Sequence, residues 1–492
     1  MRTLSALPLD DDILDRILTF CPTFITLQST ILVSKAFYNV FQTHPKSITR
    51  AVAYNLVGPA LPQALRVVRY SYVDREGTDP LEAKKAAELP PDEVAGECPE
   101  DPTPGFITAS ETVKLQDISA ILEELENVYS LTQKDRSSRT SVLTHDQSFR
   151  FRRALLRFWL FTNIFKVDRY VLEDLETEAP DEDVKRIQAQ RAAVLNVYPT
   201  DELREIWAAV QFVRGLYEAM DDGHELYSLG VTFDVLVACG PRGALHAWSQ
   251  RRLDAVEDLF DLLLLDIGDM DDRGLHEGFF DVPVRRVWAD RGVSAPEDEC
   301  PRSTVAPVWK PPPRLPGPVI FGPAEITDEK ERVYEAARNI ILVDGVVGAR
   351  DACSQCASQR GVSLLCHANW HHLNVHPSQF LKSRLHDNDA ETEAVEMATA
   401  DITGTDEIAE WLEGLLSFRE GPYSSWTADL EYCTPCLTRF LDDHVWKWWL
   451  AERTEDGSVL PDNCPDGYDC RNLYNGPHAE EKNHLCVPTK EE

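Results

Sequence analysis

Residues 151–165 read FRRALLRFWLFTNIF, and this stretch decides the fold class that the sequence predicts. Its apolar-face residues recur at steps of three and four, which is the spacing of one helix face. They are Phe151, Ala154, Leu155, Phe158, Trp159, Thr162 and Phe165. Further along, Ile206, Val210, Val213 and Tyr217 repeat the step. Because alternating β-branched runs are scarce, we expect a mainly α protein, with short strands confined to its cysteine-rich part.

Composition sets limits on the partners of this chain of 492 residues. Its 83 acidic residues outnumber 49 basic ones, for a formal net charge of -34. Nucleic-acid affinity is largely phosphate neutralisation by Lys and Arg, so we do not expect a nucleic-acid partner.

No apolar run approaches the roughly 20 residues that span a bilayer. Asp10, Asp11 and Asp12 follow the first residues closely and leave no secretory apolar segment. We therefore expect an intracellular protein of the cytoplasm or nucleus, without membrane contact.

Shifts in composition divide the chain into segments. An acidic stretch that contains Pro90 and Pro91 predicts a linker, and a second proline-dense stretch predicts an extended connector. We also expect a helix over 328–342 and a solvated loop over the acidic residues 387–406. The expected divisions are a helical N-terminal segment at 1–70, a linker at 75–105, a helical domain at 108–300, a connector at 301–325, a cysteine-rich module at 326–455 and a small finger at 460–487.

The N-terminal segment predicts two short amphipathic helices. Pro8 and the aspartates at 10–12 suit a helix start, where the helix dipole favours anions. An apolar stripe follows, formed by Ile13, Leu14, Ile17 and Leu18. Pro22 ends this helix, and residues 27–41 predict a second one.

The order of these features resembles an F-box. Leu7 and Pro8 open the motif, the Ile/Leu stripe follows, and Val33-Ser34-Lys35-Ala36-Phe37 stands where the family usually has Val-Cys-Lys-x-Trp. F-box proteins dock through this helical unit on a Skp-type adaptor protein of a Skp–cullin–F-box ubiquitin ligase. The resemblance implies an adaptor interface formed in or beside Leu7, Pro8, Ile13, Leu14, Ile17, Val33 and Phe37. From the residues alone, the same side chains could instead be the core of a small helical cap.

The strongest compositional signal is a concentration of cysteine and histidine near the end of the chain. Cys353-x-x-Cys356 and Cys433-x-x-Cys436 are two knuckles, whose spacing lets two thiolates reach one tetrahedral zinc ion. A knuckle, a long excursion and a second knuckle that opens a helix are the layout of a treble-clef finger. The spacer of 76 residues far exceeds the usual length of about 15 to 20.

Two alternatives remain for these knuckles. The remaining ligands could come from local residues, namely Cys366, His367, His371 and His372. A Cys-x-x-Cys pair can also be a redox site, although no βαβ pattern surrounds either pair.

A second ligand set, Cys464, Cys470, His478 and His484, has the spacing C-x5-C-x7-H-x5-H. It resembles the poly(ADP-ribose)-binding zinc finger, in which the second spacer is one residue shorter. Gly467 and Arg471 match the family, whereas Asp466 replaces the family aromatic. Residues 433–492 carry six basic and twelve acidic side chains, so a polyanion would meet net repulsion. We expect zinc here, with Cys486 either a neighbour or a substitute for one histidine.

The sequence contains no recognised catalytic motif, and we do not expect an enzyme. Over its whole length the chain resembles F-box-type proteins common in fungi. The first hypothesis is therefore a substrate-recruiting adaptor of a ubiquitin ligase with about two structural zinc ions. The alternatives are a zinc-finger interaction protein or ADP-ribose-reading protein without a ligase role, and an enzyme of unrecognised type. Nothing names the substrate.

Overall fold

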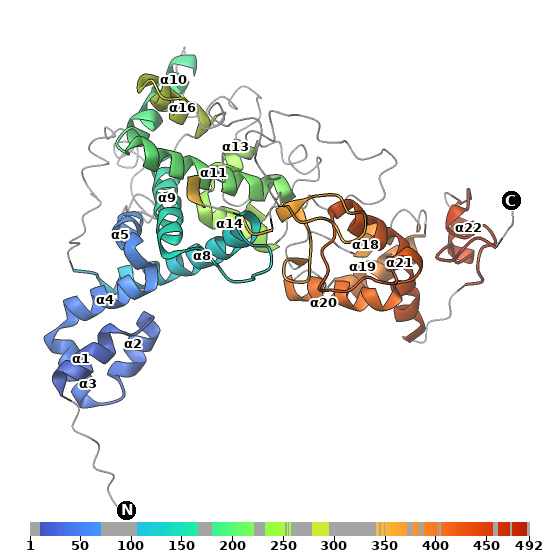
Figure 1. Ribbon diagram of the computed structural model, residues 1–492, viewed down its shortest axis with the longest axis horizontal. Helices are drawn as coiled ribbons and strands as arrows, with labels where there is room; N and C mark the ends of the chain where they lie inside the picture. The colour runs from blue at the N-terminus through green and yellow to red at the C-terminus, as the bar shows by residue number, and fades with distance from the viewer. Residues whose placement is uncertain are drawn as a thin grey trace, which may run out of the picture.

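The computed structural model is mainly helical, as the sequence predicts (Figure 1). The residues that it describes are 10–69, 106–165, 180–220, 232–250, 253, 255–256, 278–294, 341–343, 346–348, 350–370, 377–381, 385, 388–400, 402, 405–455, 461–472 and 475–489. The predicted linker at 75–105 and the predicted connector at 301–325 lie outside these residues. Of the helix expected over 328–342, only its end at 341–342 is described, and it is helical there.

Five helices and one 3-10 turn form the N-terminal part. They are α1 (Asp11–Thr19), α2 (Phe24–Ile31), α3 (Lys35–Thr43), α4 (Pro45–Val57), η1 (Gly58–Ala60) and α5 (Leu61–Arg69). Helices α1 to α3 and the start of α4 enclose a small core of their own, which includes Leu14, Leu18, Leu27 and Val40. The end of α4 and all of α5 belong to the core of the middle domain instead. This N-terminal unit therefore stands at one end of the molecule, joined to the rest through α4 (Figure 1).

The single helix predicted over 27–41 is wrong, because the structure contains two helices there. Helix α2 ends at Ile31, and α3 begins at Lys35. The backbone N–H of Phe37 donates to the Ser34 side chain at 3.4 Å, so Ser34 caps the start of a new helix. A serine hydroxyl that satisfies such an orphan donor favours a helix start over a helix interior.

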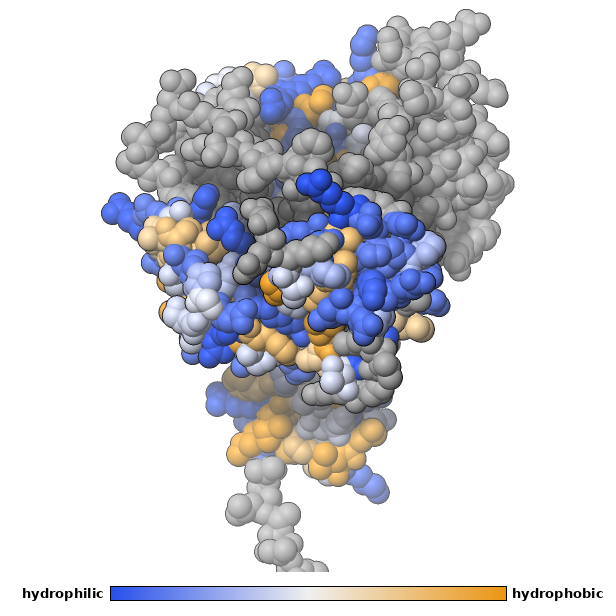
Figure 2. Space-filling model, turned by 90° about the vertical axis from the view of Figure 1, so that its right-hand side faces the viewer, coloured by the Kyte–Doolittle hydropathy of each residue, from blue (hydrophilic) through white to orange (hydrophobic). Residues whose placement is uncertain are grey.

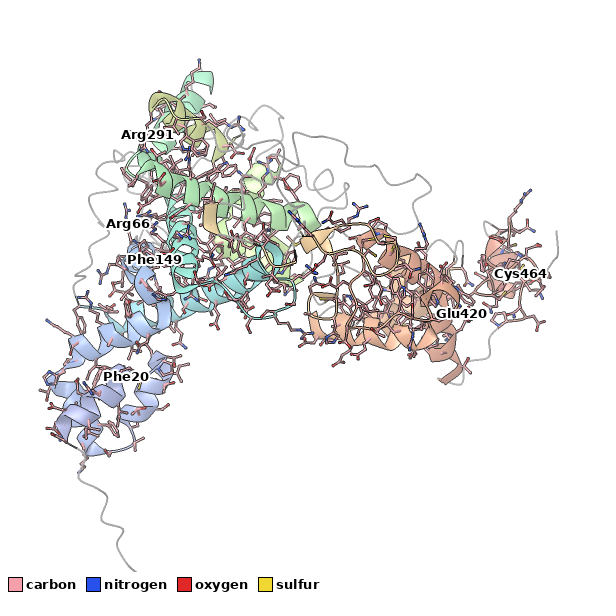
Figure 3. The ribbon with its side chains drawn as sticks, viewed as in Figure 1. Phe20, Arg66, Phe149, Arg291, Glu420 and Cys464 are labelled. Atoms are coloured by element: carbon pink, nitrogen blue, oxygen red, sulfur yellow. The ribbon has the colours of Figure 1, made fainter. Side chains whose placement is uncertain are left out.

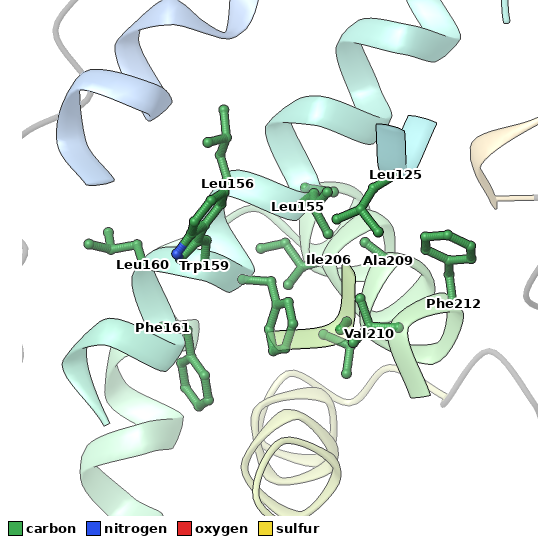
Figure 4. Packing of buried hydrophobic residues seen from close by; sticks show 14 of the residues in the cluster. Leu125, Leu155, Leu156, Trp159, Leu160, Phe161, Ile206, Ala209, Val210 and Phe212 are labelled. Atoms are coloured by element: carbon green, nitrogen blue, oxygen red, sulfur yellow. The ribbon is translucent and has the colours of Figure 1, made fainter. Parts of the chain in front are cut away.

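The middle domain is built around α9, which is buried on almost every side. Its helices are α8 (Ala109–Gln133), α9 (His145–Ile164), α10 (Pro180–Leu195), α11 (Thr200–Met220), α13 (Phe233–Ala238), α14 (Gly240–Gln250) and α16 (Asp281–Asp290). Capping boxes at Thr108 with Glu111 and at Thr144 with Gln147 begin α8 and α9. Every residue of the face predicted for α9 and α11 is buried, and Figure 4 shows several of them packed together. Leu156, Leu160 and Phe161 are buried as well, so α9 is a central helix rather than an amphipathic surface helix.

The cysteine-rich module and the finger complete the described chain. Their elements are η7 (Gly361–Ser363), α18 (Pro377–Leu381), α19 (Asp389–Thr399), α20 (Thr405–Leu415), η9 (Leu416–Phe418), η10 (Gly421–Tyr423), α21 (Thr434–Glu455), η11 (Gly467–Asp469) and α22 (Gly476–Glu481). Instead of the expected short strands, the described residues hold three isolated bridges, all in this part: Ala352 with Gln359, Leu365 with Tyr432, and Asn463 with Asn483.

The solvated loop predicted over 387–406 is wrong, because α19 occupies most of it. Asn388 caps α19 by accepting from the backbone N–H of Glu391 at 3.1 Å. Val395 and Thr399 lie on its buried side, with 1% and 0% of their surface exposed. The acidic residues sit on a helix because Ala, Glu and Met favour that state and two side chains reach the core. None of the described helices is long and apolar enough to cross a membrane.

Candidate metal centres

The first knuckle pair forms one cluster of four thiols. The Sγ atoms of Cys353, Cys356, Cys433 and Cys436 all lie within 4.8 Å of one another. The sulfurs of Cys356 and Cys433 are 3.6 Å apart. Zinc–sulfur bonds in a tetrahedral shell set two sulfurs about 3.8 Å apart, so this cluster has the dimensions of a four-thiolate site. The structure thus brings together the four residues that the knuckle spacing indicates, despite the long spacer.

Local backbone bonds shape both knuckles. At the first, the Cys353 N–H donates to the Ser358 carbonyl at 2.9 Å, and the Ala357 N–H donates to the Cys353 carbonyl at 2.8 Å. These two bonds close a tight loop. Ala357 takes the left-handed conformation with φ 57 to complete the turn. At the second, Cys433 precedes α21 and Cys436 lies in its first turn, where the helix dipole favours thiolate over thiol.

Backbone and side-chain contacts hold the two knuckles against each other. Ser354 N–H donates to the Glu431 carbonyl at 2.8 Å, and Cys433 N–H donates to the Cys353 sulfur at 3.2 Å. The bridge between Leu365 and Tyr432 ties the residue before Cys433 to the chain that follows the first knuckle. The two pairs of cysteines are therefore fixed relative to each other by the backbone around them.

The long spacer folds into the core of the module. Its helices α18 to α20 pack with α21 around a cluster that includes Trp370, Trp426 and Leu415. Trp426 stacks on Tyr432 with ring centroids 3.7 Å apart, directly before Cys433. The described part of the 76-residue spacer is thus largely helical and packs beside α21, which explains how the spacing can exceed that of a simple finger.

The environments of the thiols differ within this cluster. Burial raises the pKa of Cys433 to about 11, and burial also raises the pKa of Cys436. Hydrogen bonds from the hydroxyl and the backbone N–H of Ser358 lower the pKa of the exposed Cys356 to about 6. Burial without a counter-charge therefore favours the neutral thiols of Cys433 and Cys436, and a bound cation reverses this preference.

The alternative local ligands lie elsewhere. Cys366 is buried outside the cluster, where its Sγ approaches the backbone carbonyl of Arg136 at 3.9 Å. His367 lies against Trp370, with ring centroids 6.0 Å apart, and pairs with Glu413 at 3.6 Å. His371 and His372 lie outside the described residues. In the described residues, only the two Cys-x-x-Cys pairs meet at the first cluster.

The finger gathers the second ligand set in the same way. The ligand atoms of Cys464, Cys470, His478 and His484 all lie within 4.8 Å of one another. The His478 Nε2 is 3.8 Å from Cys464 Sγ, 3.4 Å from Cys470 Sγ and 3.2 Å from His484 Nε2. A tetrahedral zinc shell sets sulfur and nitrogen about 3.6 Å apart and two nitrogens about 3.3 Å apart. These four residues therefore also match a metal shell in both donor type and size.

Gly467 is required by this geometry. Its φ of +48 is left-handed, and an added Cβ would lie 2.3 Å from the Cys486 carbonyl oxygen. That contact brings the end of the finger across its first loop, and Tyr468 N–H donates to the same carbonyl at 3.1 Å. The Cys486 thiol itself points to the carbonyls of Cys464 and Asn483 and is outside the ligand cluster. Cys486 is a neighbour in this structure, not a substitute for a histidine.

The finger docks on the cysteine-rich module at its outer end (Figures 1 and 3). Asn388 Nδ2 donates to the Ala479 carbonyl at 2.9 Å, and Trp446 packs beside Tyr468 with centroids 6.4 Å apart. Ala479 follows His478 directly, so the contact joins one ligand helix to the start of α19. Among the described residues, the four-cysteine cluster and the finger cluster are the two groups that could hold a metal ion.

The residues predicted for adaptor binding divide into two groups. Ile13, Ile17 and Val33 are 47%, 40% and 73% exposed, and Phe37 is half-buried. Leu14 is only 3% exposed and belongs to the small core, so it supports the surface from beneath. Leu7 and Pro8 lie outside the described residues.

The structure adds exposed apolar side chains that the motif comparison missed. Phe20, Ile25, Leu32 and Tyr38 are all more than half exposed. Figure 2 shows apolar side chains gathered at the lower end of the molecule, over the N-terminal helices, and Figure 3 places Phe20 there. We call these residues together with Ile13, Ile17 and Val33 the N-terminal apolar surface. Helix periodicity could have indicated that some apolar residues of α1 stay exposed, since α1 carries more than one buried stripe needs, but it does not indicate which ones.

Comparisons with family models, with curated proteins and with solved structures find no match for this chain.

Proposed function

We propose that this protein is an F-box-like adaptor, which binds a Skp-type protein through its N-terminal helices and carries two structural zinc sites near its end. The N-terminal apolar surface is the observation that carries the adaptor role. It lies on a unit with its own core, so its apolar side chains are not needed to stabilise that unit. Exposed apolar side chains that gather on one part of a molecule, as they do here in Figure 2, typically mark an interaction surface.

The position of the surface also supports this role. It lies at the end of the molecule opposite the cysteine-rich module, and the middle domain stands between them (Figure 1). A partner bound to α1–α3 would leave the middle domain and the module free for a second protein. This is the arrangement that a substrate-recruiting adaptor requires.

Zinc is the metal that fits both clusters best. Four thiolates, or two thiolates with two imidazoles, are soft to borderline donors, and in each cluster the ligand atoms lie within 4.8 Å of one another, close enough to share one tetrahedral ion. Each cluster supplies four protein ligands, whereas a catalytic zinc keeps an open position. Both sites are therefore proposed as structural, and no enzymatic role is assigned to them.

A binding measurement with paired substitutions tests the adaptor role. The purified full chain, immobilised, should retain a Skp-type adaptor protein, and Val33→Asp should abolish that retention. Val113→Asp is the matched control, since Val113 is 70% exposed and belongs to α8, not to α1–α3. A chain that lacks residues 1–45 should also lose the adaptor. If the unsubstituted chain and the Val113 variant retain no adaptor, the protein is an interaction protein without a ligase role.

A further inference from the structure

One arginine of the middle domain reaches the scaffold of both knuckles. Arg136 lies in the loop after α8, and its side chain is only 4% exposed. Its Nη2 donates to the carboxylates of Asp351 and Glu431, and its Nη1 donates to the Gly348 carbonyl at 3.4 Å. Charge-assisted bonds of this kind, made by a buried guanidinium, are among the strongest hydrogen bonds in proteins.

The two carboxylates hold equivalent positions relative to the first metal cluster. Asp351 lies two residues before Cys353, and Glu431 lies two residues before Cys433. A single guanidinium therefore binds both segments of the chain that lead into the two knuckles. The two knuckles must approach each other to form the cluster. Arg136 and a metal ion bound in the cluster would therefore both favour the arrangement in which the knuckles lie together.

Gly348 packs closely against the Arg136 side chain. Gly348 has φ +67, and a Cβ there would lie 2.5 Å from Arg136 Nη1 and 2.2 Å from Asp351 Oδ2. Only glycine leaves room for the guanidinium and the carboxylate at this point. Beside it, Val347 N–H donates to the Lys134 carbonyl at 2.7 Å. The contacts of Arg136 and of Lys134 with these residues therefore also join the middle domain to the cysteine-rich module.

We infer that Arg136 couples metal binding at the Cys353/Cys356/Cys433/Cys436 cluster to the docking of the middle domain on the cysteine-rich module. The inference rests on the metal binding proposed above and is independent of the adaptor role. Arg136 is a positioning residue, because it touches the residues that orient the knuckles and not the ligand sulfurs. Coupling between two sites is reciprocal. Metal binding should therefore weaken when the docking contact is lost, and the docking contact should weaken when the metal is lost.

The first arm of the test measures zinc affinity by competition with a coloured chelator. Cys464→Ser leaves only the first cluster complete, and Cys356→Ser leaves only the second. In the Cys464→Ser chain, Arg136→Gln should weaken zinc binding by about 10- to 100-fold, as is typical when a residue that orients metal ligands is lost. In the Cys356→Ser chain, the same substitution should leave the affinity unchanged.

Arg139→Gln is the matched control. Arg139 lies in the same loop and pairs with Asp406 at 3.3 Å, yet 42% of its side chain is exposed. An exposed ion pair contributes little, so its loss should not change the zinc affinity of either cluster.

The second arm measures the reverse effect without substituting Arg136. Hydrogen exchange of the full zinc-loaded chain should show faster exchange around 134–137 and 346–351 in Cys356→Ser than in the unsubstituted chain. Cys470→Ser, which disrupts only the finger, should leave those segments protected. This arm decides the question even if the Arg136 variant fails to fold.

The outcomes separate this inference from the proposal on which it rests. Weaker zinc binding at the first cluster alone, together with faster exchange at the contact, supports the coupling. Normal zinc binding by the Arg136 variant, equal weakening of both clusters, or an unchanged contact in Cys356→Ser would overturn it. Absence of zinc from the unsubstituted chain would remove the proposed metal sites and this inference with them.

Discussion

Arg136 forms a partly buried ion pair with Glu431, although 295 residues separate them in the sequence. Glu431 lies two residues before Cys433, and Arg136 lies in the loop after α8. The pair joins the middle domain to the segment that leads into the second Cys-x-x-Cys knuckle. A cluster that composition alone assigns to a separate module is thus built partly against its neighbour.

The metal content should be two zinc ions per chain. Cys464→Ser and His484→Ala should each lower it by one, because each removes a ligand from the finger cluster. Elemental analysis of protein expressed with zinc present measures this directly. Cys366→Ser and Cys486→Ser are the controls, since both thiols lie outside the two clusters and should leave two ions bound. A content of one ion in the Cys486 variant would make Cys486 a ligand.

Chelation should unfold the cysteine-rich end and spare the helical middle. The finger has little apolar core besides its ligands, so metal binding supplies much of its folding free energy. Hydrogen exchange should therefore rise over 430–490 after removal of zinc, while α9 and α11 stay protected. Loss of protection throughout α9 would show that the middle domain cannot fold without the metal-bound part.

Two neighbouring residues of α1 should separate binding from stability. Leu18 is fully buried, so Leu18→Ala should destabilise the N-terminal unit by about 2–5 kcal/mol. Ile17 is 40% exposed, so Ile17→Asp should cost only about 1 kcal/mol while it abolishes adaptor binding. Chemical denaturation and adaptor retention measure the two effects. An Ile17 variant that binds normally would remove this side chain from the interface.

Acidification should destabilise the cysteine-rich module through His444. Burial lowers the pKa of this histidine, and the opposing bond of its Nδ1 to the Phe440 carbonyl, 2.8 Å long, does not offset it. Lys447 lowers the pKa further, whereas Asp443 and Glu420 raise it. The unfolded chain then binds more protons than the folded one below about pH 6.5. The stability that neutral His444 provides is complete above that pH and is lost as the pH falls toward the lower folded pKa.

The measurement is the free energy of unfolding of the zinc-loaded chain at pH 7 and at pH 5.5. His444→Phe keeps the stacking on Phe440, at a centroid distance of 4.5 Å, and removes the titrating group. Its stability should therefore fall less between the two pH values than that of the unsubstituted chain. Equal losses would assign the acid sensitivity to other groups, such as the thiols.

The sequence by itself determined the helical class and the two sets of cysteines and histidines. Phe151 to Phe165 carry a periodicity that survives any arrangement of neighbours, because it follows from 3.6 residues per turn. Short-range ligand pairs such as Cys353 with Cys356 are similarly fixed by local spacing. The break between α2 and α3 was missed because one capping serine decided it, and α19 was missed because its buried residues are few.

Tertiary structure alone decided which knuckles meet and which apolar side chains remain outside. Spacing cannot show that 76 residues fold back to bring Cys433 to Cys356, since that depends on the packing of α18 to α21. Nor can periodicity tell Leu14 from Ile13, which are adjacent but 3% and 47% exposed. Arg136 carried no motif, and its partners are distant in sequence. Such contacts arise only when whole elements pack, because their energy depends on burial and distance and not on local residue order.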